Sequence, residues 1–148
     1  MLRIALTTLA LLVLAVPALA DDKDTAKKLV GKWVREVGDA KVTFEIKADK
    51  MITTLHTPNG DLVVQSAYEV SKDELKCKLT KIEKNEIGAG VEEDHKFSFK
   101  FKLEDGTLTI SELKGNDGNE AGGEAKNLVE GEYKKEKEKN KEEKKDKK

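Results

Sequence analysis

Apolar and polar residues alternate with a period of two over most of the chain after residue 30. The clearest case is Lys41 to Lys47, where Val42, Phe44 and Ile46 alternate with charged or hydroxyl side chains. Neighbouring residues of a strand point to opposite faces, so this segment has one core face and one solvent face. The same alternation predicts eight strands, at about residues 30–37, 41–47, 51–57, 62–70, 75–82, 96–103, 107–113 and 127–133.

The connections between these strands are short and have turn chemistry. Pro58-Asn59-Gly60 and Asp105-Gly106 supply the positive-φ positions that tight hairpins need. Because no long helical period interrupts the strands, the pattern favours an antiparallel up-and-down sheet. An open sheet of eight strands leaves two unpaired edges, and closure removes both. We therefore predict an all-β fold, an eight-stranded antiparallel up-and-down barrel.

The predicted last strand is substantial enough to close this barrel because it contains Leu128, Val129 and Tyr133. We expect residues near Trp33 or Val34 to pair with residues 129–133. A short helical turn at 24–29, capped by Asp24, precedes the first strand. Two longer connections, 83–95 and 115–126, are rich in glycine and polar residues and are predicted to be mobile loops.

The first twenty residues have the three parts of a secretory signal peptide. A positive start at Arg3 is followed by an apolar stretch over residues 4–16 and then by Ala18-x-Ala20. The stretch is too short to span a bilayer. A buried N-terminal helix is disfavoured because the apolar residues surround the whole helix. We predict a signal peptide at 1–20 and export to the periplasm or the extracellular space, with no stable membrane insertion after cleavage.

The remaining chain fits one domain, at residues 24–134, followed by a charged tail at 135–148. From Lys134 to Lys148 there are nine Lys and five acidic residues, so with Arg3 in the signal the total of −1 leaves about −6 for residues 21–133. The tail has no apolar residue to bury and is predicted to be disordered or transiently helical. An acidic domain repels phosphate, so a nucleic-acid partner is disfavoured.

Residues suited to catalysis or metal binding are few and lie far apart in the sequence. Cys77 is the one cysteine of the chain and shares an apolar strand face, which favours a buried, inert thiol. His56 and His95 lie far apart without a second ligand at metal spacing. The 116–120 cluster has oxygen ligands but lacks the ligand order of an EF-hand. We expect no catalytic residues, no metal and no cofactor, and hence no enzyme activity.

Gly31-Lys32-Trp33 resembles the Gly-x-Trp signature at the first strand of lipocalins and related calycin barrels. In its context the chain resembles the small exported lipocalin-like proteins that form paralogous families in planctomycete-type bacteria, whose function is uncharacterised. The matching stretches are Leu29–Trp33, Phe44–Lys50, Tyr68–Val70 with Leu75, Leu108–Ile110 and Glu132–Lys134. Lipocalins place an arginine over the tryptophan. No arginine lies near the last strand here, so Lys134 or Lys135 would substitute.

The expected functional region is the barrel interior. An eight-stranded barrel is either just filled by its side chains or holds one small ligand. We expect an exported module that binds a small apolar or amphipathic molecule; the alternative is a non-enzymatic structural or protein-interaction domain of the periplasm or cell surface with a filled barrel. The predicted interior residues are Trp33, Phe44, Ile46, Tyr68, Phe97, Phe99 and Phe101.

Overall fold

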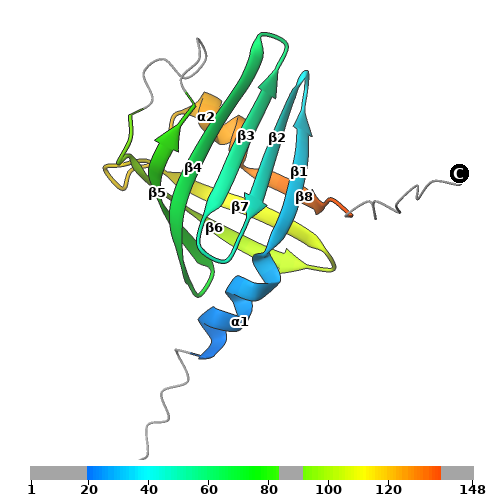
Figure 1. Cartoon of the computed structure of the whole chain (residues 1–148), viewed down its shortest axis with the longest axis vertical. Coiled ribbons are helices and arrows are strands. Elements are labelled where there is room, and N and C mark those ends of the chain that lie inside the picture. The colour runs from blue at the N-terminus through cyan, green and yellow to red at the C-terminus, as the bar shows by residue number, and fades with distance from the viewer. Residues whose placement is uncertain (1–19, 84–91, 138–148) are drawn as a thin grey trace, which may run out of the picture.

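The computed structural model describes residues 20–83 and 92–137, and within them eight antiparallel strands close into a barrel (Figure 1). The strands follow one another in sequence order around the barrel, and β8 pairs back onto β1. Their bounds are β1 (Gly31–Val37), β2 (Ala40–Ile46), β3 (Met51–Thr57), β4 (Gly60–Ser71), β5 (Glu74–Ile82), β6 (Lys96–Glu104), β7 (Thr107–Lys114) and β8 (Gly131–Lys135). The prediction of an all-β, lipocalin-like barrel is confirmed.

Two helices flank the strands, α1 (Ala20–Leu29) and α2 (Gly123–Val129). In Figure 1, α1 lies at the lower end of the barrel, directly before β1. The helix is longer than the single predicted turn, and Asp24 lies inside it rather than at its N-cap, with its carboxylate 3.5 Å from the Lys27 ammonium. The predicted signal peptide, apart from Ala20, lies outside the described residues.

The predicted last strand at 127–133 is wrong in its first half. Residues 123–129 are helical, and the strand begins only at Gly131, whose φ of 138° lets the chain turn from helix into strand. As a result the closing pairs are Trp33 with Lys135 and Val34 with Lys134, rather than partners within 129–133. The tail expected from residue 135 therefore starts later, because Lys135 is still part of β8.

The connection after β7 is more ordered than its composition indicates. A turn is closed by the Gly118 N–H donating to the Gly115 carbonyl, and Lys114 forms a β-bridge with Glu120. The chain then enters α2 at Gly123, so the mobile loop predicted over 115–126 is wrong in its last part. The other predicted loop, 83–95, falls largely on residues outside the described ranges.

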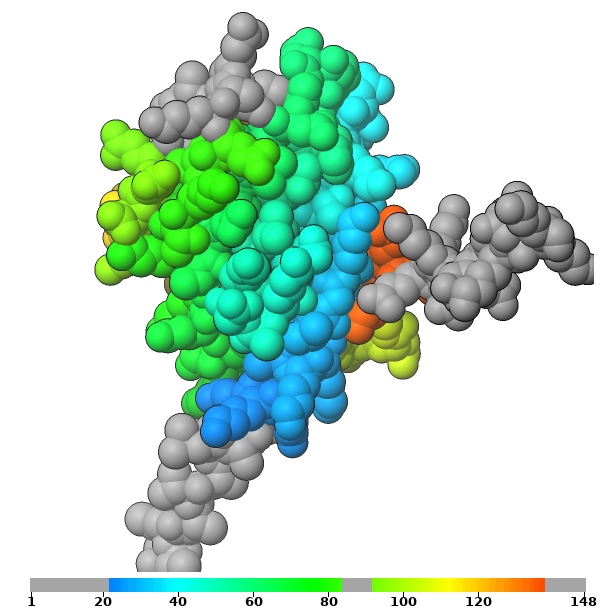
Figure 2. All heavy atoms as spheres, in the orientation of Figure 1, coloured from blue at the N-terminus to red at the C-terminus, as the bar shows by residue number. Residues whose placement is uncertain are grey.

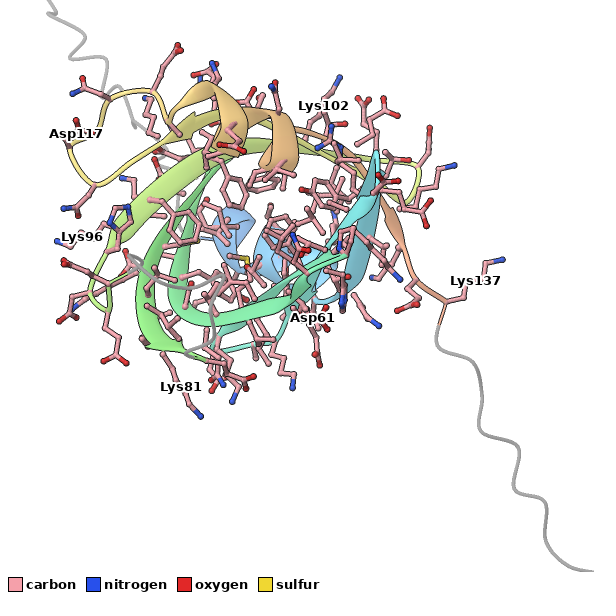
Figure 3. All side chains as sticks on the ribbon, turned by 90° about the horizontal axis from the view of Figure 1, so that it is seen from above. Asp61, Lys81, Lys96, Lys102, Asp117 and Lys137 are labelled. Carbon is pink, nitrogen blue, oxygen red and sulfur yellow. The ribbon has the colours of Figure 1, made fainter. Side chains whose placement is uncertain are left out.

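The register places every second strand residue inside the barrel. One cross-strand row joins Trp33, Phe44, Thr53, Val64 and Ile82, and a neighbouring row joins Ile46, Met51, Ser66 and Leu79. Most charged side chains take the other face: in Figure 3 the labelled Lys81, Lys96 and Lys102 point away from the barrel. The outer surface of the wall is continuous on the face shown in Figure 2.

Candidate functional site: the barrel interior

The end of the barrel beside α1 is closed around Trp33. Its indole Nε1–H donates to the carbonyl of Leu29 at 2.7 Å, which ties β1 to the last residue of α1. Both side chains are essentially inaccessible to solvent. The Lys135 Nζ lies 5.2 Å from the Trp33 ring centroid, so this lysine takes the position expected for a cation over the ring.

Glycine at Gly31 makes this arrangement sterically feasible. Its φ is +142°, and a Cβ built there would lie 2.5 Å from Cε of Lys135. The glycine of the Gly-x-Trp triplet thus serves two purposes, because it allows the backbone conformation at the start of β1 and leaves room for the lysine stem that crosses the indole.

A series of aromatic side chains in contact with one another fills the half of the barrel next to Trp33. The Phe44 ring centroid lies 5.0 Å from that of Tyr133 and 6.1 Å from that of Phe99, and Phe97 stacks on Phe99 at 6.3 Å. These separations are those of rings in direct contact. This half, the Trp33 half, is therefore occupied by the protein's own side chains.

The seven predicted interior residues divide into two groups. Trp33, Phe44, Ile46, Phe99 and Phe101 are buried in the core, where they pack the Trp33 half. Tyr68 and Phe97 are only half-buried. They lie on either side of Cys77 in one cross-strand row, and these three residues contribute to the lining of a pocket of 580 Å³ at β4, β5, β6 and the 115–118 turn.

Sequence reasoning missed the residues at the other end. Although Val42, which pairs with Arg35 and Leu55, is buried, several other inward-facing positions beyond the aromatic rings are half-buried. We call them the far half of the barrel: Arg35, Val37, Leu55, Thr57, Leu62 and Val64. The alternation of aliphatic residues in a strand does not show how far along the barrel axis each residue lies. The sequence therefore indicates mainly the large aromatic residues as interior candidates.

Arg35 is a charge on the inner face, and the structure explains its position. Its Nη1 donates to the carbonyls of Asn127 at 3.0 Å and Leu128 at 2.8 Å, at the C-terminal end of α2. A cation at a helix C-terminus is stabilised by the exposed carbonyls. Gly131 lies directly under the guanidinium, since a Cβ there would be 2.6 Å from Nε of Arg35.

Two further hydrogen bonds fix α2 and the start of β8 against the barrel. The Glu130 carboxylate accepts the backbone N–H of Leu113 at 2.8 Å, and the Tyr133 hydroxyl donates to the carbonyl of Val129 at 2.7 Å. Burial raises the pKa of Tyr133, so the hydroxyl stays protonated as a donor. Together with Arg35 these contacts hold α2 at the edge of the far half.

Two inward-facing hydroxyls lack a partner. Ser66 is fully buried and its Oγ accepts and donates no hydrogen bond within the described part of the chain, and the same holds for the buried Oγ1 of Thr53. Cys77 is also buried, and desolvation raises the pKa of its thiol. The predicted buried thiol is thus confirmed.

The remaining candidate catalytic or metal-binding residues do not lie close together. His56 pairs with Asp61 at 2.9 Å in the β3–β4 hairpin, and His95 is exposed. Within residues 20–83 and 92–137, no three His, Cys, Asp or Glu side chains gather as a metal site would require. In the same ranges no helix is long and apolar enough to cross a membrane.

A surface pocket of 1200 Å³ lies at the Trp33 end and has mixed charge. It is lined by the start of β1, the end of β2, the 105–106 turn and the end of β8. Lys32 pairs with Glu136 at 2.5 Å and Lys47 with Glu45 at 3.1 Å along this lining. Because neighbouring charges of both signs pair with each other, this pocket has little preference for a charged ligand.

Comparison with protein-family models, curated proteins and solved structures finds no match to this chain. The fold and the interior contacts therefore carry the functional argument.

Proposed function

We propose that this protein is an exported, non-enzymatic module that binds a small apolar or amphipathic molecule in the far half of its barrel. The single observation that carries the proposal is the difference between the two halves. Aromatic rings in contact fill the Trp33 half, whereas Leu55, Leu62 and Val64 point inward in the far half and are only half-buried. Inward-facing aliphatic residues that keep some solvent-accessible surface suit an apolar ligand.

The resemblance to small exported lipocalin-like proteins is part of this proposal. It is supported by the Gly31-x-Trp33 geometry, with the indole buried against Leu29 and covered by Lys135. A plugged end at Trp33 leaves the opposite end for ligand entry, and α2 lies toward that end in Figure 1. Loops and short helices at a barrel end are suited to control such an entry.

Binding is tested with the neutral fluorescent probe N-phenyl-1-naphthylamine. We expect saturable enhancement of its fluorescence by the purified protein. Leu62→Trp places an indole in the far half and is expected to weaken binding at least tenfold. The matched control Val63→Trp, one residue along β4, points outward and is expected to bind as the wild type does. Far-UV circular dichroism verifies that both variants fold.

The absence of saturable binding would favour the alternative, a structural or protein-interaction domain with a filled barrel. Equal weakening by Leu62→Trp and Val63→Trp would place the probe outside the barrel. Export is tested separately by N-terminal sequencing of the protein recovered outside the cytoplasm, where Asp21 is expected as the first residue. Retention of Met1 would refute a cleaved signal peptide.

A further inference from the structure

The outer wall of the barrel differs in charge from one side to the other. Residues 51–67, which form β3 and most of β4, contain a single Asp, Glu, Lys or Arg residue, Asp61, in a chain of which 39% of the residues are charged. The outward-facing positions of β5 and β6, by contrast, are mainly lysines: Lys76, Lys78, Lys96, Lys100 and Lys102. The wall formed by β1 to β4, nearest the viewer in Figure 1, is therefore the less charged one.

Strand register gathers uncharged side chains into one patch on this wall. A central row crosses the outer face of β1 to β4, and a shorter row lies beside it on β3 and β4. We call these residues the uncharged patch: Val34, Thr43, Thr54 and Val63 in the central row, with Ile52 and Gln65 beside them. All but the buried Thr43 keep part of their surface accessible, and the wall is continuous in Figure 2. Such a surface suits a flat protein partner better than a small ligand.

Charged residues border the patch on both sides, and their signs alternate. On β1, the outward-facing residue toward the far end is Glu36 and the one toward the Trp33 end is Lys32. On β2 the order is reversed, because Lys41 is the cross-strand partner of Glu36 and Glu45 is that of Lys32. Each border of the patch thus contains one base and one acid, in opposite order.

This order makes the surface complementary to itself. If a second copy is turned about a two-fold axis along the central row, Lys41 of one copy faces Glu45 of the other and Glu36 faces Lys32, and each contact occurs twice. A two-fold axis along the strands, between β2 and β3, would instead place the carboxylates of Glu36 and Asp61 against each other. Opposite charges across an interface fix its register, whereas facing like charges oppose association. The charges therefore favour the axis along the central row.

We infer that the uncharged patch is a dimerisation surface, which binds the same patch of a second copy of this chain about a two-fold axis along its central row. The two sheets then pack face to face with aligned strands, as in a β-sandwich. Because a barrel wall is convex, contact centres on β2 and β3, and the interface is small and the dimer weak. The patch lies on the outer face, so this inference does not depend on ligand binding in the far half.

The centre of the interface is tested with Thr54→Lys, measured by sedimentation equilibrium of the purified protein. Thr54 lies on the proposed axis, so the substitution brings two ammonium groups together, and we expect dimerisation to weaken about tenfold or more. The matched control is Thr109→Lys, on the outer face of β7, which is expected to dimerise as the wild type does. Far-UV circular dichroism verifies that both variants fold.

The direction of the axis is tested by exchanging charges. Lys41→Glu should weaken dimerisation about tenfold, since it replaces two attractive contacts by repulsive ones. Adding Glu45→Lys restores opposite charges across the axis and should bring the dissociation constant back to within about threefold of the wild-type value. The control Lys102→Glu makes the same change in net charge on β6 and should have little effect.

Four results would overturn the inference. A monomer at every protein concentration up to about 1 mM would exclude a specific dimer. A dimer that is unchanged in Thr54→Lys would place the interface elsewhere on the barrel. Failure of Glu45→Lys to rescue Lys41→Glu would refute the axis along the central row. An equal effect of Lys102→Glu would attribute the weakening to net charge alone.

Discussion

Lys135 and Trp33 are backbone partners in the β1–β8 ladder, and the lysine Nζ also lies 5.2 Å above the tryptophan ring. One pair of residues thus joins the first strand to the last and covers the side chain that plugs the barrel. Because β1 and β8 share only two register pairs, Trp33 with Lys135 and Val34 with Lys134, each side-chain contact across this seam matters more than one elsewhere in the sheet.

Removing the cation over the indole is expected to weaken the seam. Lys135→Ala should lower the free energy of unfolding by about 0.5–1 kcal/mol, the range for a cation–π contact at an exposed site. Lys135→Arg should retain the stability, because a guanidinium stacks well on an aromatic face. Urea denaturation followed by Trp33 fluorescence measures both. Lys134→Ala is the matched control, and an equal effect there would attribute the loss to the strand rather than to the ring contact.

Truncating the plug itself should cost far more. Trp33→Ala is expected to destabilise the protein by about 3–5 kcal/mol, since it removes a fully buried indole and leaves a cavity. Trp33→Phe keeps part of the packing but loses the hydrogen bond to Leu29, so an intermediate loss is expected. Far-UV circular dichroism in urea follows these variants. A loss below 1 kcal/mol for Trp33→Ala would show that the indole is not part of the core.

Gly131 is expected to be the glycine least tolerant of a side chain on the β8 side of the barrel. Gly131→Ala combines a positive φ with a contact of 2.6 Å to the Arg35 guanidinium. Gly118→Ala is the matched control, because it has a φ of +77° but no atom within 4 Å of the added Cβ. The control should cost about 1–2 kcal/mol through backbone conformation alone.

Gly131→Ala should therefore destabilise more than Gly118→Ala by chemical denaturation. Adding Arg35→Ala tests the steric part through a double-mutant cycle. The two changes at Gly131 and Arg35 should cost less together than the sum of the single variants. Strict additivity would show that Arg35 does not pack against Gly131.

Alkaline pH should destabilise the protein through Cys77. Burial raises the pKa of this thiol above its ordinary value of 9.0, so the folded state keeps the proton that the unfolded state releases. The stabilising contribution is thus fully present below pH 9 and is lost as the pH rises above it. Linkage gives a loss of about 1.4 kcal/mol at pH 10 relative to pH 7.

The matched variant for this pH dependence is Cys77→Ala, whose unfolding free energy should fall less between pH 7 and pH 10. Buried Tyr133 adds a similar effect, but its ordinary pKa of 10.0 moves that contribution to higher pH. Urea titrations at several pH values measure the slopes. Identical slopes for wild type and Cys77→Ala would show that the thiol is accessible in the folded state.

The sequence by itself determined the first seven strands, their order and their inner faces. Period-two alternation placed Val42, Phe44 and Ile46 on one face, and all three are buried in the structure. Hairpins such as the one at Asp105-Gly106 fall where the turn residues predict them. These features are local, because the alternation of side chains and the φ requirement of a turn depend on neighbouring residues alone.

Only the tertiary structure decided how the barrel closes and which end is filled. Leu128 and Val129 fit a strand by composition, yet Arg35, 92 residues distant in sequence from Asn127, donates hydrogen bonds to the carbonyls at the end of a helix at this point. Likewise, the contacts of the Phe44 ring with Phe99 and Tyr133 depend on strand pairing across the closed sheet. A periodic pattern specifies which face of a strand points inward but not its height along the barrel axis, because height is set by the stagger of all eight strands together.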